Sequence, residues 1–306
     1  MAIIGAPKTT HTTLECIELE DSLRFYTEVM GLSTLTMAPK AGGALASNGH
    51  WVAVLQVPRL TPQPFLNFYT RPVKDRAAVD EAHRRITEVR DRYGIQEIRQ
   101  PANEDPAKFG VGTYGFYLKD RDGNWWRIEE NNGPFGPVVL PSDAEPKGSI
   151  VPAGPISYVT LESRHLDRTR EFYSDFLGLS VRPGGSGWFL AEGHGGAVRV
   201  IVVESGDKAL PQEVLNHHGL TLSCDTATID RLHEQAQAVA GKYGLEILPA
   251  TSQHGAYSFY LRDQDSNWWE VETWEDGIDP VGRVLHSPIM HGNITQEILA
   301  STAAGR

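Results

Sequence analysis

The sequence is poor in cysteine, with only Cys16 and Cys224 among its 306 residues. Two cysteines cannot supply the several cross-links that stabilise small secreted domains, so a disulfide framework is excluded and a reducing compartment is expected. The N-terminal stretch MAIIGAPKTTH has too short an apolar run for a secretory signal. We therefore expect a cytoplasmic location.

Long apolar runs and an excess of basic residues are also lacking. No segment approaches the roughly 20 apolar residues of a membrane-spanning helix, so we expect no membrane partner. The net charge is −11, from 28 Lys and Arg against 39 Asp and Glu, which argues against nucleic acid as a partner. Apolar residues make up 40% of the chain, as in soluble globular proteins. A small, neutral or weakly charged ligand, or another protein, is left as the partner.

What the sequence does contain is an internal repeat. The stretch SLRFYTEVMGLS (22–33) matches RTREFYSDFLGLS (168–180), and GFYLKDRDGNWWRIE (115–129) matches SFYLRDQDSNWWEVE (258–272). The shared Phe25 and Phe172 are 147 residues apart, and Arg127 and Glu270 are 143 apart. The repeat therefore spans most of the chain.

Each copy divides again into a short strand, an amphipathic helix and further short strands. In 226–243, for example, Ile229, Leu232 and Ala236 fall on one helical face. We predict an α+β protein of four βαβββ modules, at about 10–58, 64–130, 156–204 and 214–274. The predicted domains are an N-terminal pair of modules (1–135), a Pro- and Gly-rich linker (136–155), a C-terminal pair (156–281) and a tail without a counterpart (282–306).

A first strand that starts with His, a helix FYxxxxGL and a closing FYLxDxDxNxxE resemble the vicinal oxygen chelate superfamily, from about His11 to Thr273. Four modules in one chain look like its extradiol ring-cleaving dioxygenases, although glyoxalases, epimerases and antibiotic-binding proteins share the scaffold. The resemblance implies two curled sheets, each forming a cup from two modules. It also implies metal ligands at the start of a module's first strand and at the third residue after the Asn of the closing motif.

Two of these ligand positions open modules 1 and 3. His11 lies 14 residues before Phe25, and Tyr158 lies 14 residues before Phe172, so the two positions correspond. If modules 3 and 4 share a cup, as in ordinary extradiol enzymes, Tyr158 takes the first ligand position. If modules 1 and 4 share it, as in the branch that cleaves hydroquinones, His11 does. We prefer His11 but leave Tyr158 open.

Module 4 opens with two histidines, His217 and His218. Alternate residues of a strand face the same way, so only one of them points into the cup. Counting from His217, Leu220 and Leu222 fall on the face that packs outward, which favours His217 as the ligand and keeps His218 as the alternative.

The closing motifs differ at the remaining ligand position. Glu270 occupies it in module 4 and Arg127 in module 2, and an arginine has no lone pair for a metal. The implied set is His11, His217 and Glu270. Two imidazoles and one carboxylate are the facial triad of non-haem Fe(II) oxygenases, with Mn(II) as the alternative metal.

The resemblance also implies two catalytic residues beside the metal. His254 would donate or accept a proton, and Tyr260 would hydrogen-bond the metal-bound substrate oxygen. The turn departs from the family pattern at Gln264 and Ser266, and only four residues separate His254 from Phe259.

The remaining motif residues are expected to be structural. The tryptophan pairs of both closing motifs are expected to pack, with at most one of each pair facing the cup. His194 is placed in a surface turn. His50, His83, His165 and His233 are expected at the surface or on helices.

The resemblance therefore implies a metal-dependent dioxygenase, with Fe(II), that uses O2 to cleave a catechol or hydroquinone ring. A glyoxalase-like lyase or isomerase and a non-catalytic binding protein are the alternatives. Assembly into a homo-oligomer is common in the family and is left open, as is the substrate.

Overall fold

The computed structural model describes residues 2–61, 63–103, 113–141, 148–274 and 291–292. The first two predicted modules are both present. Module 1 contains β1 (Lys8–Cys16), α1 (Leu19–Glu28), β2 (Ser33–Ala38), β3 (Ala41–Leu45) and β4 (Trp51–Gln56). Module 2 contains β5 (Phe68–Val73), α2 (Arg76–Glu88), α3 (Arg90–Tyr93), β6 (Glu97–Ile98), β7 (Ala102–Asn103), β8 (Tyr114–Lys119) and β9 (Trp125–Glu130).

The other two modules follow the same order. Module 3 contains β10 (Val159–Ser163), α4 (Leu166–Glu171), the π-helical turn η1 (Phe172–Phe176), β11 (Ser180–Gly185), β12 (Trp188–Glu192) and β13 (Arg199–Glu204), and the short 3₁₀ helix η2 (Gly206–Lys208) follows it. Module 4 contains β14 (His217–Thr221), α5 (Thr226–Tyr243), β15 (Glu246–Ile247), β16 (Thr251–Gln253), β17 (Ala256–Arg262) and β18 (Trp268–Trp274). A last strand, β19 (His291–Gly292), pairs with β2.

The long helices begin and end where their sequences dictate. The carboxylates of Asp75 and Asp225 accept hydrogen bonds from the backbone N–H of Ala78 and Thr228 and cap the starts of α2 and α5. Helix α5 ends at Gly244, whose φ of 64° is accessible to glycine at little cost. The predicted apolar face of α5 is confirmed, since Ile229 and Ala236 are buried in the main core and Leu232 packs against that core.

The two sheets do not follow the two halves of the chain. One sheet, the 1–4 sheet, has the order β15-β17-β18-β14-β1-β4-β3-β2-β19, and the other, the 2–3 sheet, has the order β11-β12-β13-β10-β5-β9-β8-β6. The sheets therefore pair module 1 with module 4 and module 2 with module 3, which is the pairing preferred for His11 rather than the pairing of modules 3 and 4. The reason is that β1 pairs with β14 and β5 with β10, across the middle of the sequence.

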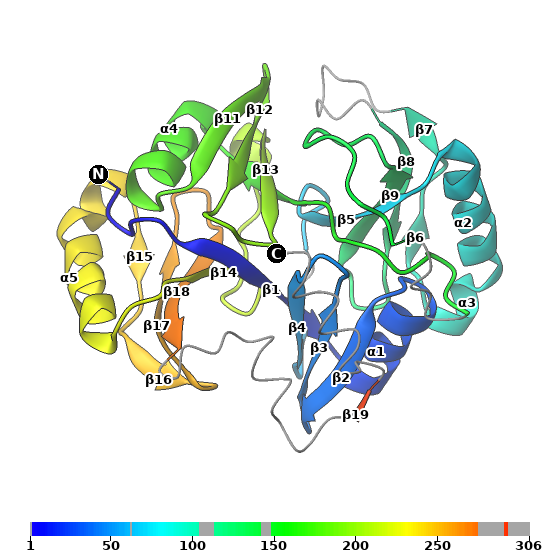
Figure 1. Ribbon diagram of the computed structural model, residues 1–306, viewed down its shortest axis with the longest axis horizontal. Coiled ribbons are helices and arrows are strands. Elements are labelled where there is room, and N and C mark those ends of the chain that lie inside the picture. The colour runs from blue at the N-terminus through cyan, green and yellow to red at the C-terminus, as the bar shows by residue number, and fades with distance from the viewer. Residues whose placement is uncertain (1, 62, 104–112, 142–147, 275–290, 293–306) are drawn as a thin grey trace.

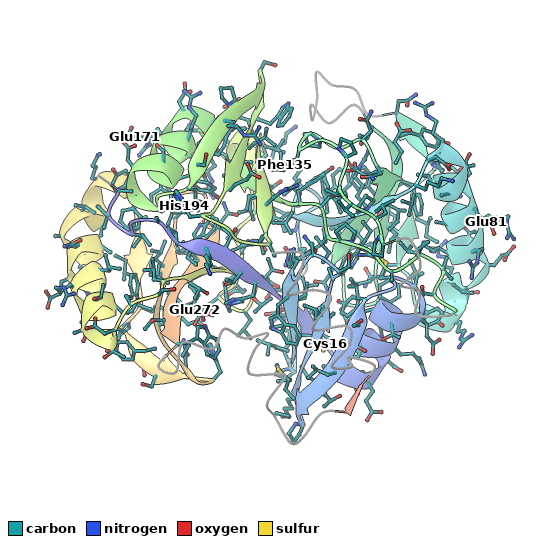
Figure 2. All side chains as sticks on the ribbon, in the orientation of Figure 1. Cys16, Glu81, Phe135, Glu171, His194 and Glu272 are labelled. Atoms are coloured by element: carbon teal, nitrogen blue, oxygen red, sulfur yellow. The ribbon has the colours of Figure 1, made fainter. Side chains whose placement is uncertain are left out.

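Both sheets are curled and open, and the helices cover their outer faces (Figure 1). Glu81 on α2 and Glu171 on α4 lie on these outer helices, whereas Glu272 lies inside, on the 1–4 sheet (Figure 2). No helix in the described part of the chain is long and apolar enough to cross a membrane.

The acidic turns of the closing motifs hold neighbouring modules together within each half. Asp122 accepts a hydrogen bond from the backbone N–H of Ile17 (3.0 Å), and the Asn124 amide donates to the carbonyl of Glu15 (3.3 Å). In the second half, Asp265 and Asn267 bind the backbone of Arg164 and Glu162 in the same way. The repeated motif thus ties module 2 to module 1 and module 4 to module 3.

The tryptophan pairs face opposite ways, as expected. Trp126 and Trp269 are fully buried in the main core, while Trp125 packs in the cup of the 2–3 sheet and the Trp268 indole donates to the carbonyl of Gln212. The expectation for His50 is wrong. It is fully buried, because its imidazole packs under the sheet against Tyr69 and bonds Thr12 (3.0 Å).

Candidate metal centre

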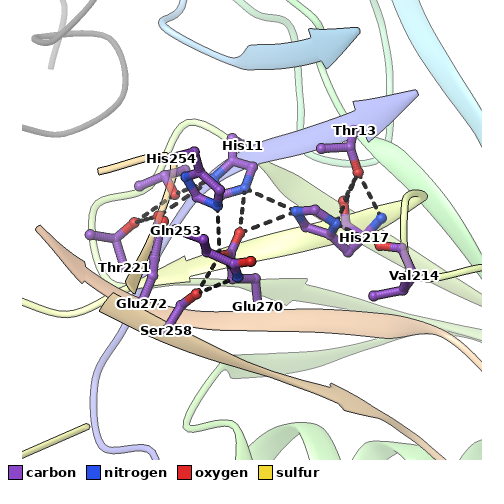
Figure 3. Close-up of polar contacts among 11 residues, drawn as sticks. His11, Thr13, Val214, His217, Thr221, Gln253, His254, Ser258, Glu270 and Glu272 are labelled. Carbon is purple, nitrogen blue, oxygen red and sulfur yellow. Dashed lines mark hydrogen bonds and ion pairs between the residues drawn. The ribbon is translucent and has the colours of Figure 1, made fainter. Parts of the chain in front are cut away.

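Three neighbouring strands of the 1–4 sheet bring the predicted ligands together. Strand β14 lies between β1 and β18, pairing antiparallel with the first and parallel with the second. His11, His217 and Glu270 all point into the cup, and all three are buried (Figure 3). Tyr158, the alternative to His11, lies at the edge of β10 in the other sheet.

The choice between the two histidines of β14 is also settled by strand alternation. His217 faces Glu270, whereas the His218 ring faces the opposite side and lies 5.5 Å from the ring of Trp269. The prediction of His217 as the inward residue is confirmed.

The three donor atoms form a compact triangle. Glu270 Oε2 lies 3.3 Å from His11 Nε2 and 3.2 Å from His217 Nε2, and the two nitrogens are 3.4 Å apart. Ligands at about 2.0–2.2 Å from one metal ion would be separated by about 3.0–3.4 Å, so the triangle fits a single ion. Among the described residues, Glu270 Oε2 is buried without a hydrogen-bond partner, which also fits a group that awaits a cation.

The second nitrogen of each imidazole fixes its orientation. His217 Nδ1 donates to the carbonyl of Val214 (2.7 Å), which leaves the Nε2 lone pair facing Glu270. His11 Nδ1 lies 3.5 Å from Oε1 of the buried Glu272. A carboxylate or carbonyl behind each imidazole is the usual support of a metal-binding histidine.

Electrostatics keep a proton on the ion-free cluster. Burial lowers the pKa of His11, but the carboxylates of Glu272 and Glu270 outweigh burial and raise that pKa to about 10. For Glu270 burial acts to raise the pKa, but the three neighbouring imidazoles of His11, His217 and His254 outweigh burial and hold that pKa well below the usual range. A buried anion is thus neutralised by a proton where a metal ion would otherwise supply the charge.

The two predicted catalytic residues lie beside the triad, His254 near Oε1 of Glu270 and Tyr260 near the ring of His217. His254 lies in the turn before β17 with φ of 40°, and its Nε2 is 3.2 Å from Glu270 Oε1. Its side chain is 47% exposed, so it can exchange protons with solvent. Tyr260 is opposite Glu270 in the β17–β18 ladder, with its ring 4.9 Å from that of His217. Burial and the charge of Glu270 raise the pKa of Tyr260 far above its usual value, so the phenol keeps its proton to donate.

Four supporting residues were not identified from the sequence. Ser258 donates to Glu270 Oε1 (2.7 Å), and the Thr13 hydroxyl lies 3.2 Å from His217 Nδ1. Glu272 Oε1 lies 3.5 Å from His11 Nδ1. Gly219 was missed although a glycine inside a strand often marks a close approach. A Cβ at Gly219 would lie 2.1 Å from the His11 ring, so only glycine leaves room for that ligand.

The cup of the 2–3 sheet has no such cluster among its described residues. The paired strand positions match His217 to Phe68 and Glu270 to Arg127, so Phe68 occupies the ligand position at the start of module 2. Arg127 bonds Glu129 (2.9 Å), which also accepts from the Tyr158 hydroxyl (2.9 Å). A fixed guanidinium supplies the positive charge there.

A hollow of about 450 Å3 adjoins the triad. Its wall contains Gln253, whose amide nitrogen lies 3.5 Å from Glu270 Oε1, and Val214, whose carbonyl orients His217. The full lining is Val214, Leu215, Leu248, Pro249, Thr251, Gln253 and Tyr260. The three triad residues themselves do not line this hollow. Another hollow, of about 410 Å3, lies beside α1 and α2.

His194, expected in a surface turn, is exposed between β12 and β13 and takes no part in the centre.

Comparison with known proteins identifies the fold. No family model and no curated protein sequence matches the chain. Among solved structures, a glyoxalase I mutant from Zea mays is similar with a TM-score of 0.62 and 14% identity over 88% of this chain and 92% of that one. A protein described as a putative dioxygenase from Bacillus subtilis gives a TM-score of 0.55 and 15% identity over 88% and 86%. The four modules, the curled sheets and these likenesses show that the chain has the vicinal oxygen chelate fold.

Proposed function

We propose that this protein is a metal-dependent dioxygenase that cleaves a dihydroxylated aromatic ring, with Fe(II) held by His11, His217 and Glu270. The observation that carries the proposal is the triangle of two imidazole nitrogens and one orphaned carboxylate oxygen, each 3.2–3.4 Å from the others. Within the described residues no fourth ligand joins this group. A facial triad leaves open positions for both a diol and O2.

The chain's own residues account for binding and proton transfer. Bound Fe(II) would act as a Lewis acid that lowers the pKa of the diol, and it would also supply the redox chemistry of O2. Tyr260, which stays protonated, donates a hydrogen bond to a substrate oxygen beside His217. His254, beside Glu270 and half exposed, accepts the diol proton and passes it to solvent.

The pairing of modules 1 and 4 favours a hydroquinone over a catechol, because it resembles the hydroquinone-cleaving branch of the superfamily. Both series belong in the assay. Oxygen uptake by the Fe(II)-loaded protein is measured with each, for the native chain and for His217→Ala and Glu270→Ala. We expect each variant to lose more than about a hundredfold in the rate of oxygen uptake. Changing a residue that only supports a ligand costs up to about a hundredfold, and these variants remove a ligand itself.

His194→Ala is the matched control, since this histidine is exposed and does not belong to the cluster of ligand atoms, and its loss should leave the rate unchanged. Native rates in either triad variant would rule the proposal out.

A second function, a glyoxalase-like lyase or isomerase, is favoured by the likeness to glyoxalase I. A lyase or isomerase of this kind consumes no O2. If the protein loaded with Zn, Ni or Mn is active under anaerobic conditions, the second function replaces the first. A protein that binds no metal at all would instead support a non-catalytic binding role.

A further inference from the structure

The hollow beside the triad has one polar end and one apolar end. Gln253 and Tyr260 form the polar end, and both lie next to Glu270. Val214, Leu215 and Leu248 form the apolar wall together with Pro249. Because Gln253 and Tyr260 connect the hollow to Glu270, a ring bound at the triad can place a substituent against the apolar wall.

The apolar wall comes from two segments of module 4 that line the same hollow. Val214 and Leu215 immediately precede β14, which carries His217, and Leu248 and Pro249 connect β15 to β16. The backbone N–H of Leu248 donates to the carbonyl of Tyr260 (2.9 Å), which fixes the second segment against the strand beside Glu270. The wall is therefore tied to the same strands as the ligands.

The charge of a ring substituent decides whether this wall can accept it. None of the seven lining residues is Lys, Arg or His. A carboxylate placed against the wall would lose its hydration without a cation to replace it. An alkyl or halogen substituent would instead gain from leaving water.

We infer that the substrate is a diol ring with an uncharged, apolar substituent, and that Leu248 with its neighbours selects it over carboxylated diols. This inference rests on the proposed function. It adds the class of substituent, which the triad alone does not specify.

The test is anaerobic calorimetry on the Fe(II)-loaded protein. The probes are catechol, 4-tert-butylcatechol and 3,4-dihydroxybenzoate, and the para series of hydroquinone, tert-butylhydroquinone and 2,5-dihydroxybenzoate. In whichever series binds, we expect the tert-butyl diol to bind at least about tenfold tighter than the parent. The carboxylated diol should bind at least about tenfold weaker than the parent.

Two variants of Leu248 test whether this wall selects the substituent. Leu248→Lys should bring carboxylated and parent diols to equal affinity and weaken the tert-butyl diol. Leu248→Ala, which adds no charge, should weaken only the tert-butyl diol. Leu210→Lys is the control, since Leu210 is 56% exposed and does not line the hollow.

The outcomes separate the two proposals. Binding of all diols with equal affinity, or Leu248→Lys behaving like Leu210→Lys, would overturn the inference and leave the proposed function standing. Binding of no diol in either series would overturn both.

Discussion

At the scale of single residues, the candidate centre needs room for the His11 ring as well as the three side chains that offer ligand atoms. His11 lies across β14 at the one position, Gly219, where a side chain is absent. On either side of that position, His217 and Thr221 face the same cup. The imidazole of His11 thus reaches Glu270 only because a strand residue between the ligands is glycine.

We expect Gly219→Ala to displace His11 and weaken metal affinity by at least about tenfold, the lower end of what disturbing a ligand's support costs. Affinity is measured by competition with a chromophoric chelator. Gly241→Ala is the control, because a Cβ there meets nothing within 4 Å and alanine favours the helix. Equal affinities in the two variants would show that His11 is not a ligand.

The proton held by the ion-free cluster predicts how metal binding depends on pH. Since the pKa of His11 is raised to about 10, the proton is bound throughout the neutral range and a metal ion must displace it. We expect Mn(II) affinity to rise up to about tenfold per pH unit between pH 6.5 and 8.5, followed by electron paramagnetic resonance.

Glu272 contributes the largest attraction for that proton. Its replacement in Glu272→Gln should therefore flatten the rise of affinity at the alkaline end. An affinity independent of pH would contradict protonation of His11 in the ion-free chain.

At the scale of elements, the corresponding strands β18 and β9 each carry a buried charged side chain, but the two charges are opposite in sign. In β18 the buried carboxylate Glu270 meets two imidazoles, whereas in β9 the buried guanidinium of Arg127 meets Glu129. Arg127 also donates to the carbonyl and the hydroxyl of Thr113 (3.0 and 2.9 Å). In the second cup a guanidinium therefore takes the place that the carboxylate of Glu270 has in the first.

We expect Arg127→Met to lower the free energy of unfolding by about 3–5 kcal/mol, because it leaves Glu129 charged and buried. Urea denaturation measures the loss, and Arg127→Met combined with Glu129→Leu should recover most of it. Metal binding in the 1–4 sheet should not change.

Arg84→Met removes an exposed arginine that pairs with Glu81, and it should leave the free energy of unfolding almost unchanged. If Arg127→Met costs as little, the pair in the second cup is not the stabilising contact that its burial implies.

At the scale of the whole molecule, two kinds of contact bind the modules. The acidic turns join consecutive modules, as Asp122 joins Ile17, while the sheets join modules from opposite halves. His11 comes from the first half of the chain, and His217 and Glu270 come from the second. Neither half contains a complete centre.

We expect fragments 1–141 and 148–306, expressed together, to associate and bind one metal ion per pair, because β1 pairs with β14 and β5 with β10. Each fragment alone should bind no metal with comparable affinity. Copurification and metal analysis test this, and a metal-binding second fragment would show that His11 is dispensable.

Much of this arrangement could be predicted from local sequence. The repeat, the module order, the inward position of His217 and the contrast between Glu270 and Arg127 follow from spacing and strand alternation, which act over a few residues. Gly219 and Glu272 were not recognised, because their roles depend on a ring that belongs to another strand.

The sequence by itself determined the modules, since hydrophobic period and turn chemistry act locally, and its resemblance to a family implied which residues offer ligands. Only the tertiary structure decided that module 1 rather than module 3 lies beside module 4, and hence that His11 rather than Tyr158 meets Glu270. The physical reason is that β1 and β14 are about 200 residues apart, and edge pairing between similar strands leaves no mark in either strand alone.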